Sequence, residues 1–349
     1  MMESIPLKNE GRYSMKLGTY ILKRIFLMFI VMFGVATIVF FITHIIPADP
    51  VGAILGGNAP IEMVDEMKHQ LGLDKPILFQ FVDYVKAAYH LDFGTSLKSN
   101  RPVLTDIINY FPATFELTII SMIFAITIGV ILGVYSAIHR NKSIDHFSRV
   151  FSILGVSMPV FWLGLLLLLL FYYHLDLLPG GGRNSLFIFP PRITGLILLD
   201  SVLAGDWTAF WDGFRHIILP AFVLGYASAA SIARITRASM LDILNQNFIR
   251  TAKSKGLSKR IVVYRHALKN ALIPVVTIIG ISFGFNLSGA VLTETIFSWP
   301  GLGRYIVNAL LAFDYPAVTG GTLFIALVFS MANLVVDISY AALDPRMRV

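Results

Sequence analysis

The residues best suited to contact another molecule form a basic stretch between two strongly apolar segments. The stretch runs from Phe248 to Pro274 and reads FIRTAKSKGLSKRIVVYRHALKNALIP. A polar and cationic segment of this kind, set between apolar ones, is the part of such a chain most suited to be held by a partner. We therefore expect this stretch to bind a partner.

Two short helices joined by a glycine are expected to present this stretch. Apolar side chains recur at three- and four-residue spacing at Leu241, Leu244, Phe248 and Ala252. This period predicts an amphipathic helix over 241–255. Gly256 then supplies a left-handed residue that ends the helix, and Leu257 can fold back on the helix as in a Schellman cap. Ser258 is placed to cap a second helix that runs toward Asn270, which gives a rigid helix-turn-helix elbow.

The composition of the chain indicates that the elbow belongs to an integral membrane protein. Of 349 residues, 56% are hydrophobic and 14% are charged, with a mean hydropathy of +0.72. These values are far too apolar for a soluble domain and indicate an all-α integral membrane protein that spans the membrane several times. The chain has no cysteine, which excludes disulfides and cysteine-ligated metals.

Six apolar segments are long enough to cross a bilayer, at about 1.5 Å per residue against about 30 Å of hydrocarbon. They are Ile25–Ile46, Ala113–Ile138, Val150–Tyr173, Ile217–Ala233, Leu272–Leu292 and Val318–Tyr340. The segments between them alternate in charge: one set carries nineteen Lys and Arg residues and the other nine. The richer set belongs inside, so both termini and the elbow are expected to be cytoplasmic.

This topology divides the chain into a cytoplasmic N-terminal segment, 1–24, and a six-span transmembrane domain, 25–349. Within the membrane domain we expect a small folded outer cap at 47–112. A second outer segment, 174–215, is expected to be a loop with an interfacial aromatic belt. The cytoplasmic loop that carries the elbow is 234–270.

The elbow resembles the cytoplasmic coupling loop of permease subunits in binding-protein-dependent ABC importers, in particular the dipeptide, oligopeptide and nickel branch. The similarity lies in Arg250–Leu257 and Arg265–Pro274. The wider superfamily begins this loop with Glu-Ala-Ala, and this chain departs from it in a way that the peptide branch resembles. Further similarities extend over most of the chain, at Leu71–Pro76, Asp92–Ser96, Ser157–Gly164, Glu294–Arg304, Asn333–Asp337 and Asp344–Arg346.

The resemblance implies a type I importer permease fold in the inner (plasma) membrane that forms half of a translocation pore. It implies as partners a second homologous permease, two ATP-binding-cassette ATPases, an external or periplasmic substrate-binding protein and membrane lipid, but no nucleic acid. ATP and Mg²⁺ would lie on the ATPases. The residues that match the coupling motif are Arg250, Thr251, Ala252, Lys255, Gly256 and Leu257.

Polar residues in or near the spans are the candidates for a translocation pathway. Asn286 and Ser288 lie in the fifth span among glycines, where they could face a wet cavity or merely accompany close helix packing. Glu294 and Arg304 follow that span, and they could contact the binding protein or substrate, or form a structural ion pair with each other.

Two further acidic residues and two prolines are interpreted as structural. Glu116 lies near the outer end of the second span, and Asp337 near the inner end of the sixth. Charges at such depth ask for a partner or for water. Pro159 and Pro220 are expected to kink or break their helices.

The sequence lacks the motifs of an enzyme or of a self-energised pump. It has no Gly-x4-Gly-Lys-Ser/Thr loop and no His-Glu-x-x-His pair, so no catalytic residue, cofactor or metal ligand is assigned. The predicted function is uptake of di- or oligopeptides, with nickel or oligosaccharides as alternative substrates. A nucleotide-independent channel or secondary transporter remains the alternative from another class, and an intramembrane enzyme lacks any constellation of residues.

Overall fold

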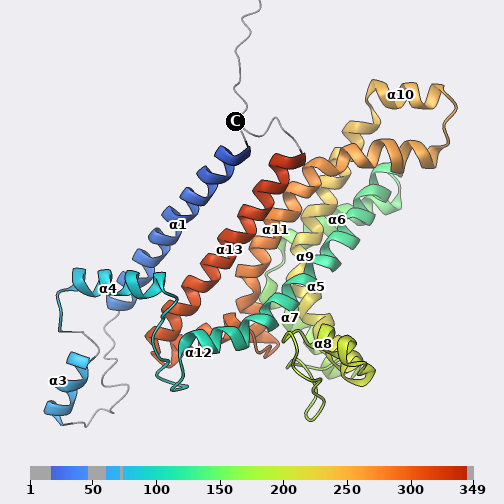
Figure 1. The fold of residues 1–349 in the computed structure, drawn as a ribbon. Helices are drawn as coiled ribbons and strands as arrows, with labels where there is room; N and C mark the ends of the chain where they lie inside the picture. Colours follow the sequence, from blue (N-terminus) through green and yellow to red (C-terminus); the bar gives the residue numbers. More distant parts are fainter. Residues whose placement is uncertain (1–16, 46–59, 71–73, 344–349) are drawn as a thin grey trace, which may run out of the picture.

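A computed structural model describes residues 17–45, 60–70 and 74–343, and within these ranges the regular elements are all helices (Figure 1). The expectations for residues 1–16, for 47–59 and 71–73 of the first outer segment and for the tail motif at Asp344–Arg346 lie outside the described residues. The all-α membrane architecture expected from the composition is confirmed.

Five helices are long and apolar enough to cross a membrane by themselves. They are α1 (Leu17–Ile45), α5 (Val103–Ile138), α9 (Trp207–Leu244), α11 (Leu268–Ile296) with the π-helical turn η2 (Ile261–Ala267) before it, and α13 (Tyr315–Leu343). Four of them reach well beyond their predicted bounds, because polar and interfacial residues continue the helix after the apolar run ends.

The third predicted span is a broken one rather than a single helix over Val150–Tyr173. It consists of α6 (Ser143–Ser157), followed by α7 (Val160–Leu167) with the π-helical end η1 (Leu168–His174), and the two parts meet at 110°. The break lies at Met158 and Pro159, whose ψ angles of 127° and 132° are extended. Proline lacks an N–H and disfavours a helical conformation in the residue before it. Pro220 lies inside the continuous helix α9 and does not break it.

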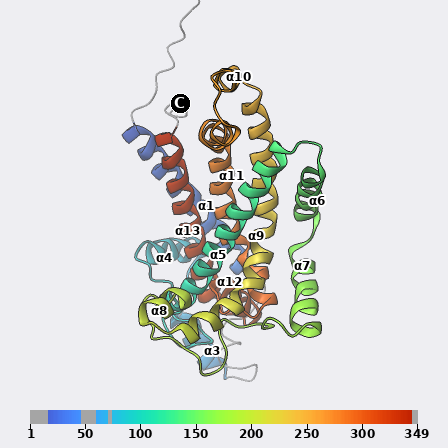
Figure 2. The ribbon, with the colours of Figure 1, turned by 90° about the vertical axis from the view of Figure 1, so that its right-hand side faces the viewer.

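The two ends of the described bundle differ in what they carry. The start of α1, the end of α13 and the short helix α10 (Asn247–Ser254) lie at one end, and α8 (Ile197–Ala204) and α12 (Leu302–Leu311) lie at the other (Figures 1 and 2). In Figure 2 the α6–α7 pair leads from the α10 end to the α8 end. If the α6–α7 pair is counted as one span, the described residues contain six membrane crossings.

The core of the bundle is the contact between α5 and α9. A Cβ added to Gly133 of α5 would overlap Thr236 of α9, and one added to Gly225 of α9 would overlap the backbone of Ser121. Small residues at these points let the two backbones approach closely. The most apolar window of α9 is 78% buried, whereas those of α1 and α13 are 11% buried. Helix α9 is thus the central element, and α1 and α13 lie at the margin.

The outer segments differ from their predictions. The first contains α3 (Ile61–Gln70) and α4 (Ile77–Tyr89), but α4 buries none of its residues fully and leans on α1, where Phe81 stacks on Phe41. The described part is therefore not a cap with a core of its own. The second, 174–215, is not only loop, since it holds α8 and the start of α9. Its tryptophans, Trp207 and Trp211, are exposed, as an interfacial belt requires.

Candidate functional site

The basic elbow is built from α10 and η2, which project from the ends of the two long helices α9 and α11 (Figure 1). The predicted helix over 241–255 is wrong, because α9 ends at Leu244 and α10 begins at Asn247. Gln246 between them is extended, with ψ at 155°. The break resets the helical phase, so that Ile249 takes the buried position and Phe248 is 40% exposed.

A Schellman motif ends α10, as the sequence predicts. Gly256 has φ at +77°, and its N–H donates to the Lys253 carbonyl at 3.0 Å. The N–H of Leu257 donates to the Ala252 carbonyl at 3.4 Å, which completes the motif. No atom lies within 4 Å of a Cβ built on Gly256. The glycine is therefore required by its left-handed backbone and not by lack of space.

The second helix of the elbow is continuous with the fifth span. Ser258 precedes it as predicted: its carbonyl accepts from Val262 N–H at 3.0 Å, and its hydroxyl lies 3.5 Å from the N of Ile261. Below the elbow lies an apolar cluster that fastens it to the ends of α5, α9 and α11; the buried members are Val134, Ala137, Met240, Ile249, Ala252, Val262, Val263, Ala267 and Ala271. Because η2 continues into α11, only two residues separate α10 from α9, and the cluster packs against all of them, a force on α10 is transmitted to α9 and α11.

The motif residues of the elbow differ in accessibility. Five of them are exposed: Arg250, Thr251, Lys255, Gly256 and Leu257. Ala252 is only 7% exposed and packs in the cluster beneath α10. The five can meet a partner, whereas Ala252 positions the helix.

A buried acidic hub that sequence reasoning missed lies near the same end of the bundle. Asp145, in the first turn of α6, has a fully buried side chain. It accepts hydrogen bonds from Arg237 Nε of α9 at 2.6 Å, from Arg149 at 2.6 Å and from the Ser136 hydroxyl of α5 at 2.6 Å. The hub joins three helices two turns below the elbow. Its only signal in the sequence is Arg149 at i+4, since Arg237 lies 92 residues away.

Glu294 and Arg304 do not form the ion pair considered as their structural role. Glu294 is fully buried, and its carboxylate accepts from the backbone N–H of Arg304 at 2.8 Å and from the Thr114 hydroxyl. Leu302 N–H donates to the Thr114 hydroxyl at 2.8 Å. Glu294 and Thr114 thus satisfy the first N–H groups of α12. The guanidinium of Arg304 instead donates to the Ser298 carbonyl at 2.7 Å.

Asn286 and Ser288 point to different sides of α11. Asn286 is 5% exposed, accepts from the Ser228 hydroxyl of α9 at 3.0 Å and donates to Met122 Sδ of α5 at 3.3 Å. Ser288 is exposed, and its hydroxyl donates to the Gly284 carbonyl of its own helix. The structure therefore does not bring Asn286, Ser288, Glu294 and Arg304 into one site.

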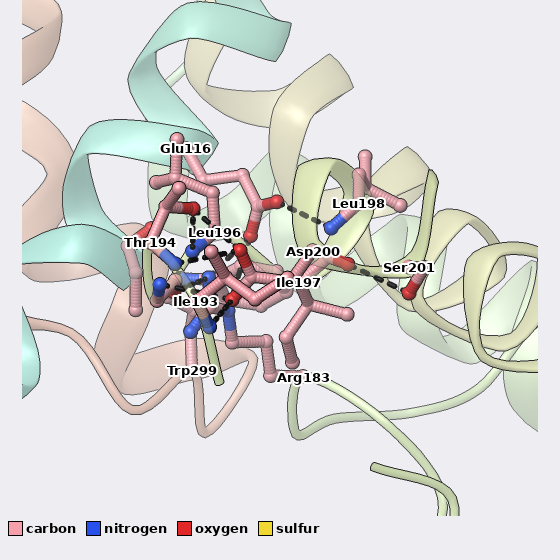
Figure 3. A network of polar contacts seen from close by, with 12 residues as sticks. Glu116, Arg183, Ile193, Thr194, Leu196, Ile197, Leu198, Asp200, Ser201 and Trp299 are labelled. Atoms are coloured by element: carbon pink, nitrogen blue, oxygen red, sulfur yellow. Dashed lines mark hydrogen bonds and ion pairs between the residues drawn. The ribbon is translucent and has the colours of Figure 1, made fainter. Parts of the chain in front are cut away.

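The two acidic residues interpreted as structural each have a cationic partner. Asp337 of α13 lies 3.0 Å from Arg24 of α1. The Glu116 carboxylate of α5 accepts from Arg183 and, at 2.8 Å, from the N–H of Leu198 in the first turn of α8 (Figure 3). Arg183 also donates to the Gly195 carbonyl at 2.7 Å and lies over the ring of Trp299. This network fixes the second outer segment to the bundle.

Comparison with known families covers most of the chain. Residues 129–349 match the family described as "Binding-protein-dependent transport system inner membrane component". Residues 17–118 match the family described as "Binding-prot-dependent transport system membrane comp, N-term".

Individual relatives match over nearly their full lengths. The probable D,D-dipeptide transport system permease protein DdpB of Escherichia coli K12 is 44% identical over 318 residues, covering 91% of this chain and 94% of the relative. The dipeptide transport system permease protein DppB of Alkalihalophilus pseudofirmus is 43% identical over 334 residues, covering 94% and 99%. The glutathione transport system permease protein GsiC of Escherichia coli O1:K1 is 39% identical over 329 residues, covering 94% and 98%.

Proposed function

The chain belongs to the family of binding-protein-dependent transport system inner membrane components, and we propose that it is one of two permease subunits of an ATP-driven importer of dipeptides. Its helices form half of the pore. A second, homologous permease forms the other half, two ATPase subunits bind ATP and Mg²⁺, and an external binding protein delivers the substrate.

The observation that carries this proposal is the construction of the elbow. An exposed, basic helix of eight residues is stopped by a left-handed glycine and fastened by a buried cluster to the helices on both sides. A partner that binds α10 and moves it must move α9 and α11 with it. Such a connection converts closure of an ATPase into rearrangement of the bundle. The bundle alone has no loop for nucleotide phosphates.

The charge distribution supports the placement of the elbow in the cytoplasm. The end of the molecule that carries α10 also holds the start of α1 and the end of α13 (Figure 1). The segments expected at this end carry nineteen of the 28 Lys and Arg residues, and such segments remain inside. Both termini are then cytoplasmic.

The substrate class rests on the relatives. Those at 42–44% identity over most of the chain are named for transport of D,D-dipeptides, dipeptides or di/tripeptides, and one at 39% for glutathione, itself a small peptide. We assign uptake of dipeptides or short peptides, in preference to nickel or oligosaccharides.

The test replaces Gly256 by valine in the full complex. Valine is strained at φ +77°, so the turn and the orientation of α10 change. We expect substrate-stimulated ATP hydrolysis and peptide uptake to fall at least tenfold. Affinity purification from the native membrane with mass spectrometry should recover a second permease and ATPases with the wild-type chain. Scrambling 248–258 should remove the ATPases.

Gly205 offers a matched control. It ends α8 at the opposite end of the bundle, with φ at +69° and no atom within 4 Å of a built Cβ. Gly205→Val therefore introduces the same strain away from the elbow and should leave ATPase recovery unchanged. Normal coupled uptake in Gly256→Val contradicts the proposal. A wild-type chain that transports without nucleotide, and purifies without an ATPase, supports a channel or secondary transporter instead.

A further inference from the structure

A cavity of about 430 Å³ lies beside the elbow, between the ends of α5 and α9 and the start of the second elbow helix. Its lining residues are Ala137, Ile138, Arg140, Leu241, Leu244, Asn245, Lys253, Leu257, Lys259, Val262 and Val263. The volume is within the range of about 300–1,000 Å³ that is usual for ligand pockets. It is large enough for more than one side chain of a partner.

The lining combines an apolar floor with cations of one sign. Six aliphatic side chains from 138, 241, 244, 257, 262 and 263 form most of the floor, and the only charged residues are Arg140, Lys253 and Lys259. All three are exposed, and none forms an ion pair with a residue that the structure describes. Their charges are therefore available to a carboxylate that enters the cavity.

We propose that this cavity receives a segment of the ATPase subunit that presents a carboxylate beside an apolar side chain. The proposal rests on the proposed function, because it assumes that an ATPase binds α10. Lys253 belongs to α10 and Leu257 to its Schellman turn, so a subunit that covers α10 also covers the cavity mouth. The contact is then reciprocal: α10 enters the ATPase, and the ATPase enters the permease.

Reciprocal insertion has a mechanical consequence. A helix that only rests in a partner's groove can be pushed, whereas an element held from both sides can also be pulled. Because the cavity floor contains the last turn of α9 and the start of η2, a segment seated there acts on both long helices. Anchoring through Arg140 adds the end of α5 to the same unit.

A photocrosslink identifies the occupant of the cavity in the intact complex. Leu244 lines the floor, and p-benzoylphenylalanine at this position should crosslink to the ATPase, at a peptide that contains Asp or Glu next to an apolar residue. The same probe at Phe147, exposed on α6 outside the cavity, is the control. Crosslinking of Leu244 only to lipid, as an anionic headgroup bound to the three cations would give, overturns the proposal.

Charge reversal tests the energetics independently. Lys253→Glu with Lys259→Glu should reduce the ATPase recovered with the permease at least tenfold. Lys23→Glu with Lys142→Glu makes the same change at exposed positions outside both the elbow and the cavity lining, and should reduce the recovery less than threefold. Equal recovery from both double variants overturns the cavity proposal. If scrambling 248–258 still removes the ATPase, the proposed function stands without the cavity proposal. If no ATPase is recovered with the wild-type chain, both the proposed function and the cavity proposal are wrong.

Discussion

Glu116 and Arg183 form an ion pair that ties the second outer segment to the outer end of α5, with 6% and 11% of their side chains exposed. The pair is not isolated. The second carboxylate oxygen of Glu116 accepts from Leu198 N–H, and Arg183 has further contacts with Gly195 and Trp299 (Figure 3). The same two side chains therefore cap α8 and close the loop before it.

Glu116→Gln should destabilise the chain strongly. The substitution leaves the Arg183 guanidinium buried without its counter-charge, and loss of one partner of a buried pair costs about 3–5 kcal/mol. The measurement is the thermal unfolding midpoint in detergent. Lys75→Gln is the matched control: its ion pair with Asp83 is about half exposed on each side, and exposed pairs of this kind contribute little to stability. Equal shifts in the two variants would contradict this assignment.

Acidification should loosen the turn before α8 through Asp200. Burial raises the pKa of this carboxyl, but the Thr194 hydroxyl and the N–H groups of Thr194, Gly195 and Ile193 outweigh burial and hold the pKa below its ordinary 3.8. A carboxyl with a lowered folded pKa stabilises the fold fully above its unfolded pKa, and this stabilisation is lost as pH falls through the folded value. The protection factors of these amides, which are ratios of intrinsic to observed exchange rates, should fall below about pH 4. In Asp200→Asn the same amides should have low protection factors already at pH 6, and these factors should no longer change between pH 6 and pH 3.

Gly301 should not tolerate even a methyl group. A Cβ there would overlap the Glu294 carboxylate, which occupies the N-terminus of α12. Gly301→Ala must displace Glu294 or α12, so we expect a loss of about 1–3 kcal/mol from overpacking. Gly289→Ala is the control, since nothing lies within 4 Å of its built Cβ. Alanine in a helix interior should be neutral or stabilising there. The measurement is the thermal unfolding midpoint of both variants, and equal midpoints would contradict the prediction for Gly301.

The parts of the fold that could be predicted from the sequence are those fixed by local pattern. Apolar runs locate the spans, and Gly256 followed by an apolar residue after a basic helical turn predicts the Schellman motif with its partners. The break at Asn245 and Gln246 could not be predicted, because neither Gly nor Pro marks it. It shifts the buried position from Phe248 to Ile249.

The polar network depends on contacts between distant segments, which spacing in one sequence does not specify. The sequence suggests an ion pair between Glu294 and Arg304, which are ten residues apart. The side-chain partner of Glu294 is instead Thr114, 180 residues away. Arg304 contributes its backbone N–H because a helix starts there and its first N–H groups need acceptors. For the same reason Asp145 was not recognised, since Ser136 and Arg237 reach it from two other helices.

Arg237 should hold α6 against α9, and Arg149 should not. Both guanidinium groups bind Asp145, but Arg149 belongs to α6 itself, whereas Arg237 comes from α9. Arg237→Met therefore removes the ion pair between the two helices, which leaves the hydrogen bond from the Tyr226 hydroxyl to the Phe151 carbonyl as the only polar contact between them that the structure describes. Arg149→Met leaves that ion pair intact. Because the chain has no cysteine, spin labels can be attached to introduced cysteines at Phe147 on α6 and Ala238 on α9, both exposed. Electron–electron distance measurements on the purified complex should show a broader distribution in Arg237→Met and an unchanged one in Arg149→Met. Equal broadening would mean that the hub acts through the buried charge alone and not as a link from α9 to α6.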